Sequence, residues 1–157
     1  MELQRRFFKA PRQSFFLFGP RGTGKSTWLR HAMPDALFVD LLQPDVTREL
    51  AARPERLRDL VRGDPERPVV VIDEVQRVPE LLSVVHLLIE SRDKRRFVLT
   101  GSSARKLRRG GVDLLAGRAV LRTLHPFMAS ELERFDLQAA LTQGFLHWRW
   151  GPTPSAN

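Results

Sequence analysis

Short, continuously apolar runs alternate along this chain with longer segments that have a helical pattern. The apolar runs are rich in aromatic and β-branched residues, and they predict five strands: Phe15–Phe18, Leu37–Asp40, Val69–Asp73, Phe97–Thr100 and Ala119–Leu124. Because these runs do not alternate with polar residues, they are typical of strands that are buried on both faces of a sheet.

The segments between the strands predict helices at Lys25–Ala32, Val46–Val61 with an interruption at Pro54, and Glu80–Glu90, and a looser one at Arg105–Leu115. In the third of these, apolar residues recur at the spacing i, i+3, i+4, i+7, which gives the helix one face to lay on a sheet. Strands that alternate with helices predict an α/β fold with a five-stranded, mostly parallel sheet sandwiched by helices. Ligands of such folds lie beyond the carboxyl ends of the strands.

The sequence GPRGTGKS, residues 19–26, follows the first predicted strand directly and matches the phosphate-loop pattern GxxxxGK[ST]. Glycines there let successive N–H groups turn toward a phosphate, a lysine adds a mobile cation, and the helix N-terminus adds about half a positive charge. The predicted nucleotide-binding residues are Gly19, Pro20, Arg21, Gly22, Thr23, Gly24, Lys25, Ser26 and Thr27. An ordinary glycine-rich turn is the alternative, but the pattern arises by chance only about once in a few hundred such chains.

A second motif, VVVIDEVQ, ends the third predicted strand in two adjacent carboxylates, Asp73 and Glu74. A carboxylate at this strand end is well placed to hold Mg²⁺ opposite the hydroxyl of Ser26, and we assign that role to Asp73. Glu74 would polarise an attacking water, which is worth about 10²- to 10⁴-fold in rate. The alternative is an acidic pair that merely faces solvent, and the phosphate loop makes the functional interpretation the stronger one.

Taken together, FFLFGPRGTGKST, FVDLLQP, VVVIDEVQRVPELL, FVLTGSSARKL, LLAGRAV and LHPFMASEL resemble the prokaryotic AAA-type P-loop ATPases over about residues 5–133. The resemblance implies an AAA-type P-loop NTPase domain that uses a glutamate beside the strand aspartate, with ATP and Mg²⁺ as cofactors. No NKxD motif is present, which argues against a GTPase. We therefore expect an ATPase domain at residues 1–135 and an atypical tail at 136–157, the start of a missing C-terminal region.

The resemblance also suggests further catalytic candidates. A polar residue at the tip of the fourth strand commonly contacts the γ-phosphate or the attacking water in this division, a role for Thr100 or Ser102. Ser102 or Ser103 would equally well cap the next helix. Arg118 is a candidate to act on the γ-phosphate, although most arginines are simply surface residues.

The composition indicates a positively charged protein and offers few further kinds of reactive or metal-binding residues. There are 26 Lys and Arg against 18 Asp and Glu, a net charge of +8, which favours anionic partners. No cysteine is present, and the four histidines are too scattered to form a metal site. No apolar stretch is long enough to span a membrane and no signal peptide is apparent, so we expect a soluble cytoplasmic protein.

Eight basic residues and one acid lie between Ser91 and Arg109. They raise a second hypothesis, an ATP-gated nucleic-acid-binding or regulatory module with little turnover. Because the only aromatic residue among them is Phe97, which belongs to a predicted strand, a solvated basic face is the simpler interpretation. The sequence leaves the oligomeric state and the coupled process open.

Overall fold

The computed structural model describes residues 6–91, 94–103, 105, 107, 112–126, 128 and 131. Five strands form one sheet: β1 (Phe15–Phe18), β2 (Leu37–Asp40), β3 (Val69–Asp73), β4 (Arg96–Gly101) and β5 (Val120–Thr123). Their order is β2-β3-β4-β1-β5, and each neighbouring pair is parallel. The predicted α/β fold is therefore confirmed, and the carboxyl ends of all five strands meet at one edge of the sheet.

Helices connect the strands as the apolar pattern predicts. They are α1 (Lys25–Ala32), α2 (Pro44–Ala52), α3 (Arg56–Gly63) and α4 (Leu81–Glu90), with short 3₁₀ turns η1 (Val75–Arg77) and η2 (Val112–Leu115). The interruption expected at Pro54 separates α2 from α3, because a proline inside a helix removes a hydrogen bond and clashes with the preceding turn. Of the looser helix expected at Arg105–Leu115, the described part contains η2, and most of the rest lies outside the described residues.

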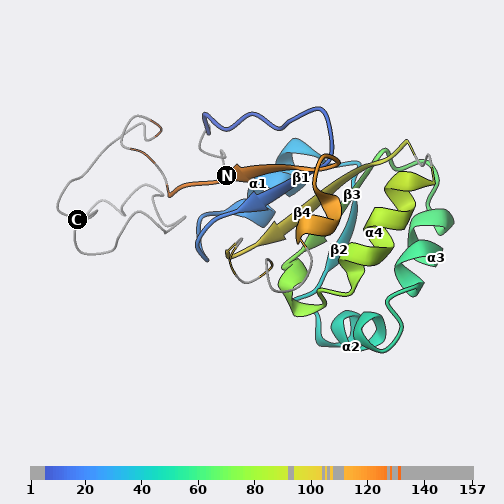
Figure 1. Ribbon diagram of the computed structural model, residues 1–157. Coiled ribbons are helices and arrows are strands. Elements are labelled where there is room, and N and C mark those ends of the chain that lie inside the picture. Colours follow the sequence, from blue (N-terminus) through green and yellow to red (C-terminus); the bar gives the residue numbers. More distant parts are fainter. Residues whose placement is uncertain are drawn as a thin grey trace, which may run out of the picture.

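The sheet is covered on both faces (Figure 1). Phe15 and Leu17 pack on one face with Leu29 of α1, whereas Phe16 and Phe18 belong to the larger core beneath α2, α3 and α4. This arrangement explains why β1 reads as four apolar residues in a row, since each face of the strand is buried against its own layer.

The alternation of side chains along a strand also determines on which face of the sheet the polar residues at the ends of β3 and β4 lie. Val69 and Val71 of β3, and Val98 of β4, belong to the core on the α1 side. Asp73 and Thr100 lie two residues beyond Val71 and Val98, so they occupy that same face. Both therefore lie on the side of the sheet that carries the loop between β1 and α1.

No helix within the described part of the chain is both long and apolar enough to cross a bilayer. The tail predicted at residues 136–157 lies outside the described residues, and the boundary at residue 135 stays a prediction.

Candidate functional site

The loop between β1 and α1 has the backbone that the glycine pattern predicts. Gly22 and Gly24 both have φ of 80°, in the left-handed region that favours glycine. At Gly19 the constraint is space, because a Cβ there would lie 2.3 Å from the carbonyl oxygen of Leu124. The first backbone bond of α1 runs from the Trp28 N–H to the Gly24 carbonyl at 2.8 Å, so the N–H groups of the first turn are left for a ligand.

Lys25 is the first residue of α1 and is only 4% exposed, because its side chain lies against this loop. Its Nζ donates to the carbonyl oxygens of Gly19 at 2.7 Å and Pro20 at 3.0 Å. Burial lowers the pKa of Lys25, while the negative charges of Glu74 and then Asp73 act in the opposite direction. One lysine thus interacts with the phosphate loop, which follows β1, and with both carboxylates of the acidic pair, which stands at the end of β3.

Asp73 is 2% exposed at the end of β3, and Thr100 of the neighbouring strand is fully buried. The Thr100 hydroxyl donates to Oδ1 of Asp73 and accepts the backbone N–H of Glu74 at 2.9 Å. In the described structure Thr100 therefore holds the acidic pair in place, and its expected contact with phosphate or water stays a prediction. Ser103 Oγ accepts the N–H of Arg105 at 3.2 Å, which matches the capping role considered for that serine.

Glu74 is the only described residue other than glycine with a positive φ; its φ and ψ are 60° and 47°. The left-handed region costs an ordinary residue about 1–2 kcal/mol, so surrounding contacts must hold it there. The Glu74 side chain is 8% exposed, and its Oε2 accepts a hydrogen bond from Nε2 of Gln76. Strain of this kind is concentrated at functional sites.

The donor set of Ser26 and Asp73 suits magnesium. A hydroxyl and a carboxylate offer hard oxygen atoms, and Mg²⁺ takes most of its other ligands from phosphates and water rather than from a protein cage. The described residues contain no group of three histidine, aspartate or glutamate side chains that could hold a metal on its own.

Arg118, a candidate to act on the γ-phosphate, lies elsewhere in the described structure. It precedes β5, and since the strands are parallel it stands at the edge opposite the phosphate loop. Its guanidinium forms an exposed ion pair with Glu90 at the end of α4. Within one chain the structure therefore does not bring Arg118 to the candidate site.

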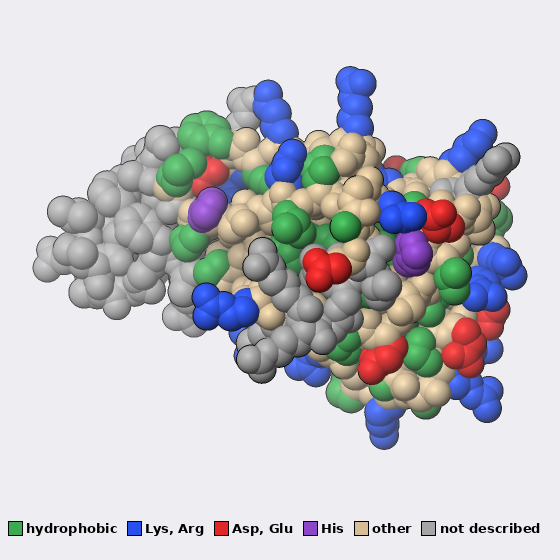
Figure 2. Space-filling view, viewed as in Figure 1, with side chains coloured by type: hydrophobic (Ala, Val, Ile, Leu, Met, Phe, Trp, Pro, Cys, Tyr) green, Lys and Arg blue, Asp and Glu red, His purple; other side chains and the backbone are tan. Residues whose placement is uncertain are grey.

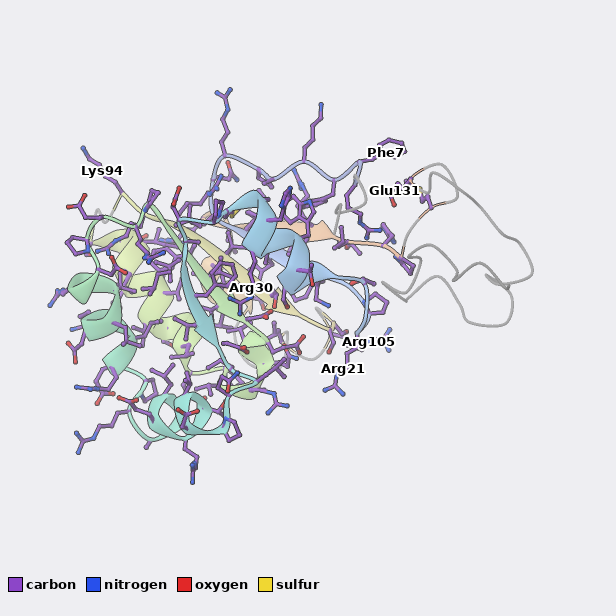
Figure 3. All side chains as sticks on the ribbon, turned by 180° about the vertical axis from the view of Figure 1, so that it is seen from behind. Phe7, Arg21, Arg30, Lys94, Arg105 and Glu131 are labelled. Atoms are coloured by element: carbon purple, nitrogen blue, oxygen red, sulfur yellow. The ribbon has the colours of Figure 1, made fainter. Side chains whose placement is uncertain are left out.

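The basic residues of segment 91–109 that the structure describes do not gather on one surface. Arg95 donates to the carbonyl oxygens of Val61 and Asp64, and Arg96 donates to that of Pro11 at 2.9 Å, so both contact the protein itself. Lys94 and Arg105 lie at opposite ends of the molecule (Figure 3). Figure 2 shows the opposite face of the molecule, and there too the Lys and Arg side chains are spread rather than gathered. Arg92, Lys106, Arg108 and Arg109 lie outside the described residues.

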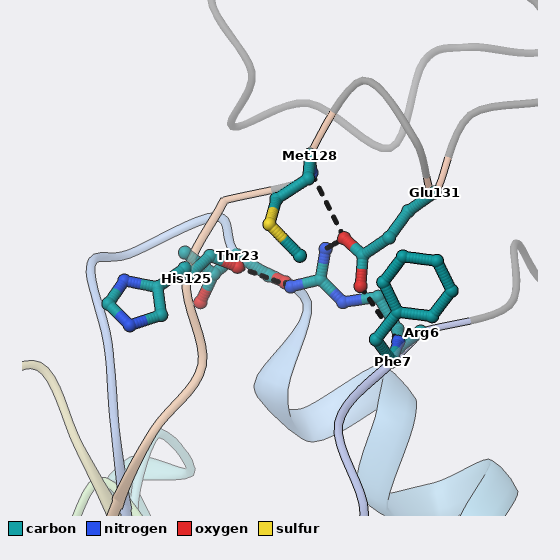
Figure 4. Close-up of polar contacts among 6 residues, drawn as sticks. All are labelled: Arg6, Phe7, Thr23, His125, Met128 and Glu131. Carbon is teal, nitrogen blue, oxygen red and sulfur yellow. Dashed lines mark hydrogen bonds and ion pairs between the residues drawn. The ribbon is translucent and has the colours of Figure 1, made fainter.

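Sequence reasoning missed a buried ion pair beside the phosphate loop. Arg6 Nη1 lies 3.2 Å from Oε2 of Glu131, and the two side chains are 4% and 5% exposed. Arg6 also donates to the carbonyl oxygens of Thr23, at 3.4 Å, and His125 (Figure 4). Because 125 residues separate the partners, no local spacing could have indicated this pair.

A hollow of about 220 Å³ lies beside this ion pair. Its walls come from the segment before β1 and the segment after β5, and they include Phe7, Phe8, Leu124, His125, Pro126 and Met128. The Phe7 side chain is 59% exposed at this place. The hollow is smaller than the pocket of a whole ligand, so its size suits one part of a ligand.

The chain is similar to known proteins in sequence and in fold. The sequence matches the AAA domain family over residues 11–133. Among solved structures, AMPPCP-bound DnaA from Aquifex aeolicus is similar, with a TM-score of 0.51 and 16% identity over 73% of this chain. Pif1 helicase from Candida albicans aligns with a TM-score of 0.44 and 17% identity over 74% of this chain. No curated protein matches the sequence.

The chain spans only part of those two proteins, 41% of the DnaA chain and 36% of the Pif1 chain. At this identity the likeness to DnaA shows the fold, a P-loop NTPase fold in which helices flank a parallel sheet. The family match is more extensive, because it runs from the segment before β1 to beyond β5. On that match, the chain belongs to the AAA domain family.

Proposed function

We propose that this domain binds ATP with Mg²⁺ and hydrolyses it to ADP and phosphate. The observation that carries the proposal is the convergence on Lys25: two carbonyl oxygens of the phosphate loop accept hydrogen bonds from its ammonium group, and the negative charges of Glu74 and Asp73 act on it from the end of β3. A cation, two carboxylates and a helix N-terminus at one strand edge suit a triphosphate and its metal.

In this proposal, different residues of the chain bind the phosphates, hold the metal and take up the proton. The backbone of Gly19–Lys25 would hold the phosphates, and Lys25 would exchange its carbonyl partners for phosphate oxygens. Ser26 and Asp73 would hold the magnesium ion, which when bound offsets the negative charge of the phosphates. Glu74 would take a proton from the water that attacks the γ-phosphorus, while the bond from that phosphorus to the bridging oxygen breaks.

The hollow beside Phe7 is a candidate binding site for the nucleobase. It lies next to the phosphate loop, since Arg6 lines it and contacts the Thr23 carbonyl. Its apolar walls and the exposed Phe7 ring suit the flat face of a purine. We therefore expect the base of ATP to lie there.

Two substitutions test the proposal. Lys25→Ala should abolish binding of a fluorescent ATP analogue, because the loop loses its cation. Glu74→Gln should keep binding and stop release of phosphate, since the amide cannot take up a proton. Lys94→Ala and Glu66→Gln are matched controls on exposed residues at the opposite edge of the sheet, and both should behave like the parent. Hydrolysis by Glu74→Gln at the parent rate would remove Glu74 from the reaction.

The position of the base has its own test. Phe7→Ala should weaken ATP binding about tenfold, the loss of one aromatic contact of roughly 1.4 kcal/mol. Inorganic tripolyphosphate has no base, so its affinity should not change in the variant. Calorimetric titration of both ligands measures the difference, and equal losses for the two would place the base elsewhere.

A further inference from the structure

Gln76 is a residue to which the phosphate-loop chemistry gives no role, yet it lies beside Glu74. It belongs to the short turn η1 that follows the acidic pair. Among the described residues, its Nε2 provides the hydrogen bond that the Glu74 carboxylate receives from another side chain. The contact therefore acts on the group that the proposed function uses as a base.

The oxygen of the Gln76 amide is costly to bury. Its Oε1 is fully buried and has no hydrogen-bond partner within the described part of the chain. A buried acceptor of this kind costs about 1–3 kcal/mol, and native proteins rarely keep one without a compensating role. The opposite orientation would set the amide oxygen against the carboxylate of Glu74, so charge dictates that the nitrogen faces Glu74.

The end of β4 leaves room for this amide. A Cβ on Gly101 would lie 2.9 Å from Gln76 Oε1, and its next neighbours would be Phe18 at 3.3 Å and Leu107 at 3.5 Å. The absence of a side chain at Gly101 thus lets Gln76 turn its nitrogen toward Glu74. Two residues 25 positions apart combine to make one contact on the carboxylate.

We propose that Gln76, with the space left by Gly101, is a positioning residue that fixes the direction of the Glu74 carboxylate. Thr100 holds the Glu74 backbone in its left-handed conformation, and Gln76 holds the side chain. The inference rests on the proposed function for its effect on turnover. The contact itself is independent of turnover, so the two can fail separately.

The first test measures the contact without nucleotide. In ¹⁵N-labelled protein, the side-chain NH₂ signals of Gln76 are those lost in Gln76→Leu, and their exchange with solvent should be slow. Gly101→Ala should shift these signals and speed their exchange, because its Cβ displaces the amide. Gly63→Ala is the control, since a Cβ there meets nothing within 4 Å. Exchange in the parent at the rate of a freely exposed glutamine would overturn the inference.

The second test measures turnover. Gln76→Leu keeps the volume and removes both the donor and the unpartnered oxygen. We expect turnover to fall by about 10- to 100-fold, as for a misplaced catalytic group, with ATP affinity unchanged. The midpoint of thermal unfolding should hold or rise, whereas a merely structural glutamine would give a less stable protein with normal turnover. That second pattern would contradict the proposal.

A double variant tests whether Gly101 acts through Gln76. If Gly101→Ala acts by displacing Gln76, the Gln76→Leu, Gly101→Ala protein should lose no more turnover than Gln76→Leu alone. Multiplying losses would mean that Gly101 acts by another route. If the parent binds ATP without hydrolysing it, the proposed function fails, while the amide exchange still decides whether Gln76 holds Glu74.

Discussion

Lys25 keeps a positive charge at a position that water scarcely reaches. Its side chain is 4% exposed, and two carbonyl oxygens accept its hydrogen bonds. Burial disfavours the charged form, and the neighbouring carboxylates offset this only in part, so its pKa lies below that of an ordinary lysine. The folded protein therefore carries a charge that would be more stable in the unfolded chain.

This lowered pKa predicts a pH dependence of stability. Between the folded pKa of Lys25 and the ordinary value of about 10.4, the unfolded chain binds more protons than the folded one. The free energy of unfolding should therefore gain a rising contribution from Lys25 as pH increases through that window. Urea unfolding of the parent and of Lys25→Met across alkaline pH measures it, since the chain has no cysteine or tyrosine to titrate there. Parallel curves for the two proteins would contradict it.

The helices and strands follow local sequence closely, and their arrangement does not. Phe15–Phe18 is a run of four apolar residues stopped by Gly19, so its limits could be predicted. The break at Pro54 was equally predictable, because the ring excludes the residue from a helix interior. The position of β4 between β1 and β3 depends on which buried faces pack together, and no local pattern carries that information.

The candidate site, too, has a part that local sequence predicts and a part that only the fold determines. The phosphate loop and the acidic pair were predictable because their chemistry requires particular residue types at particular spacings. The Thr100 contacts with Asp73 and Glu74 depend on the pairing of two strands, which only the fold determines. Gln76 carries no signal of its own, since one glutamine after two acids belongs to no spacing rule. The role that we propose for it depends on its position beside Gly101, which only the fold determines.

At the scale of the molecule, the ion pair of Arg6 and Glu131 joins the two ends of the described chain, beside the neighbouring strands β1 and β5. Glu131 also accepts the backbone N–H groups of Phe7 at 2.8 Å and Met128 at 3.0 Å. The segment before β1 and the segment after β5 are thus held together next to the phosphate loop. Burial makes this contact differ in kind from the surface ion pairs.

Removing one partner of the buried pair should therefore be costly. Glu131→Ala should lower the free energy of unfolding by about 3–5 kcal/mol, because it leaves the Arg6 charge buried without its carboxylate. Glu49→Ala is a matched control: the Glu49–Arg56 pair is equally short at 3.1 Å, but its side chains are 54% and 48% exposed. That loss should stay below about 1 kcal/mol. Urea unfolding compares the two, and similar losses would show that burial makes no difference.

The pairing of β1 has a consequence for synthesis on the ribosome. Phe15–Phe18 is made early, but its two neighbours, β4 and β5, are complete only at Gly101 and Thr123. Since the ribosome adds about 5–20 residues per second, this apolar segment stays without its partner strands for several seconds. During that interval the nascent chain presents a target for chaperones, and a chain released before β5 lacks one of the two strands that pair with β1.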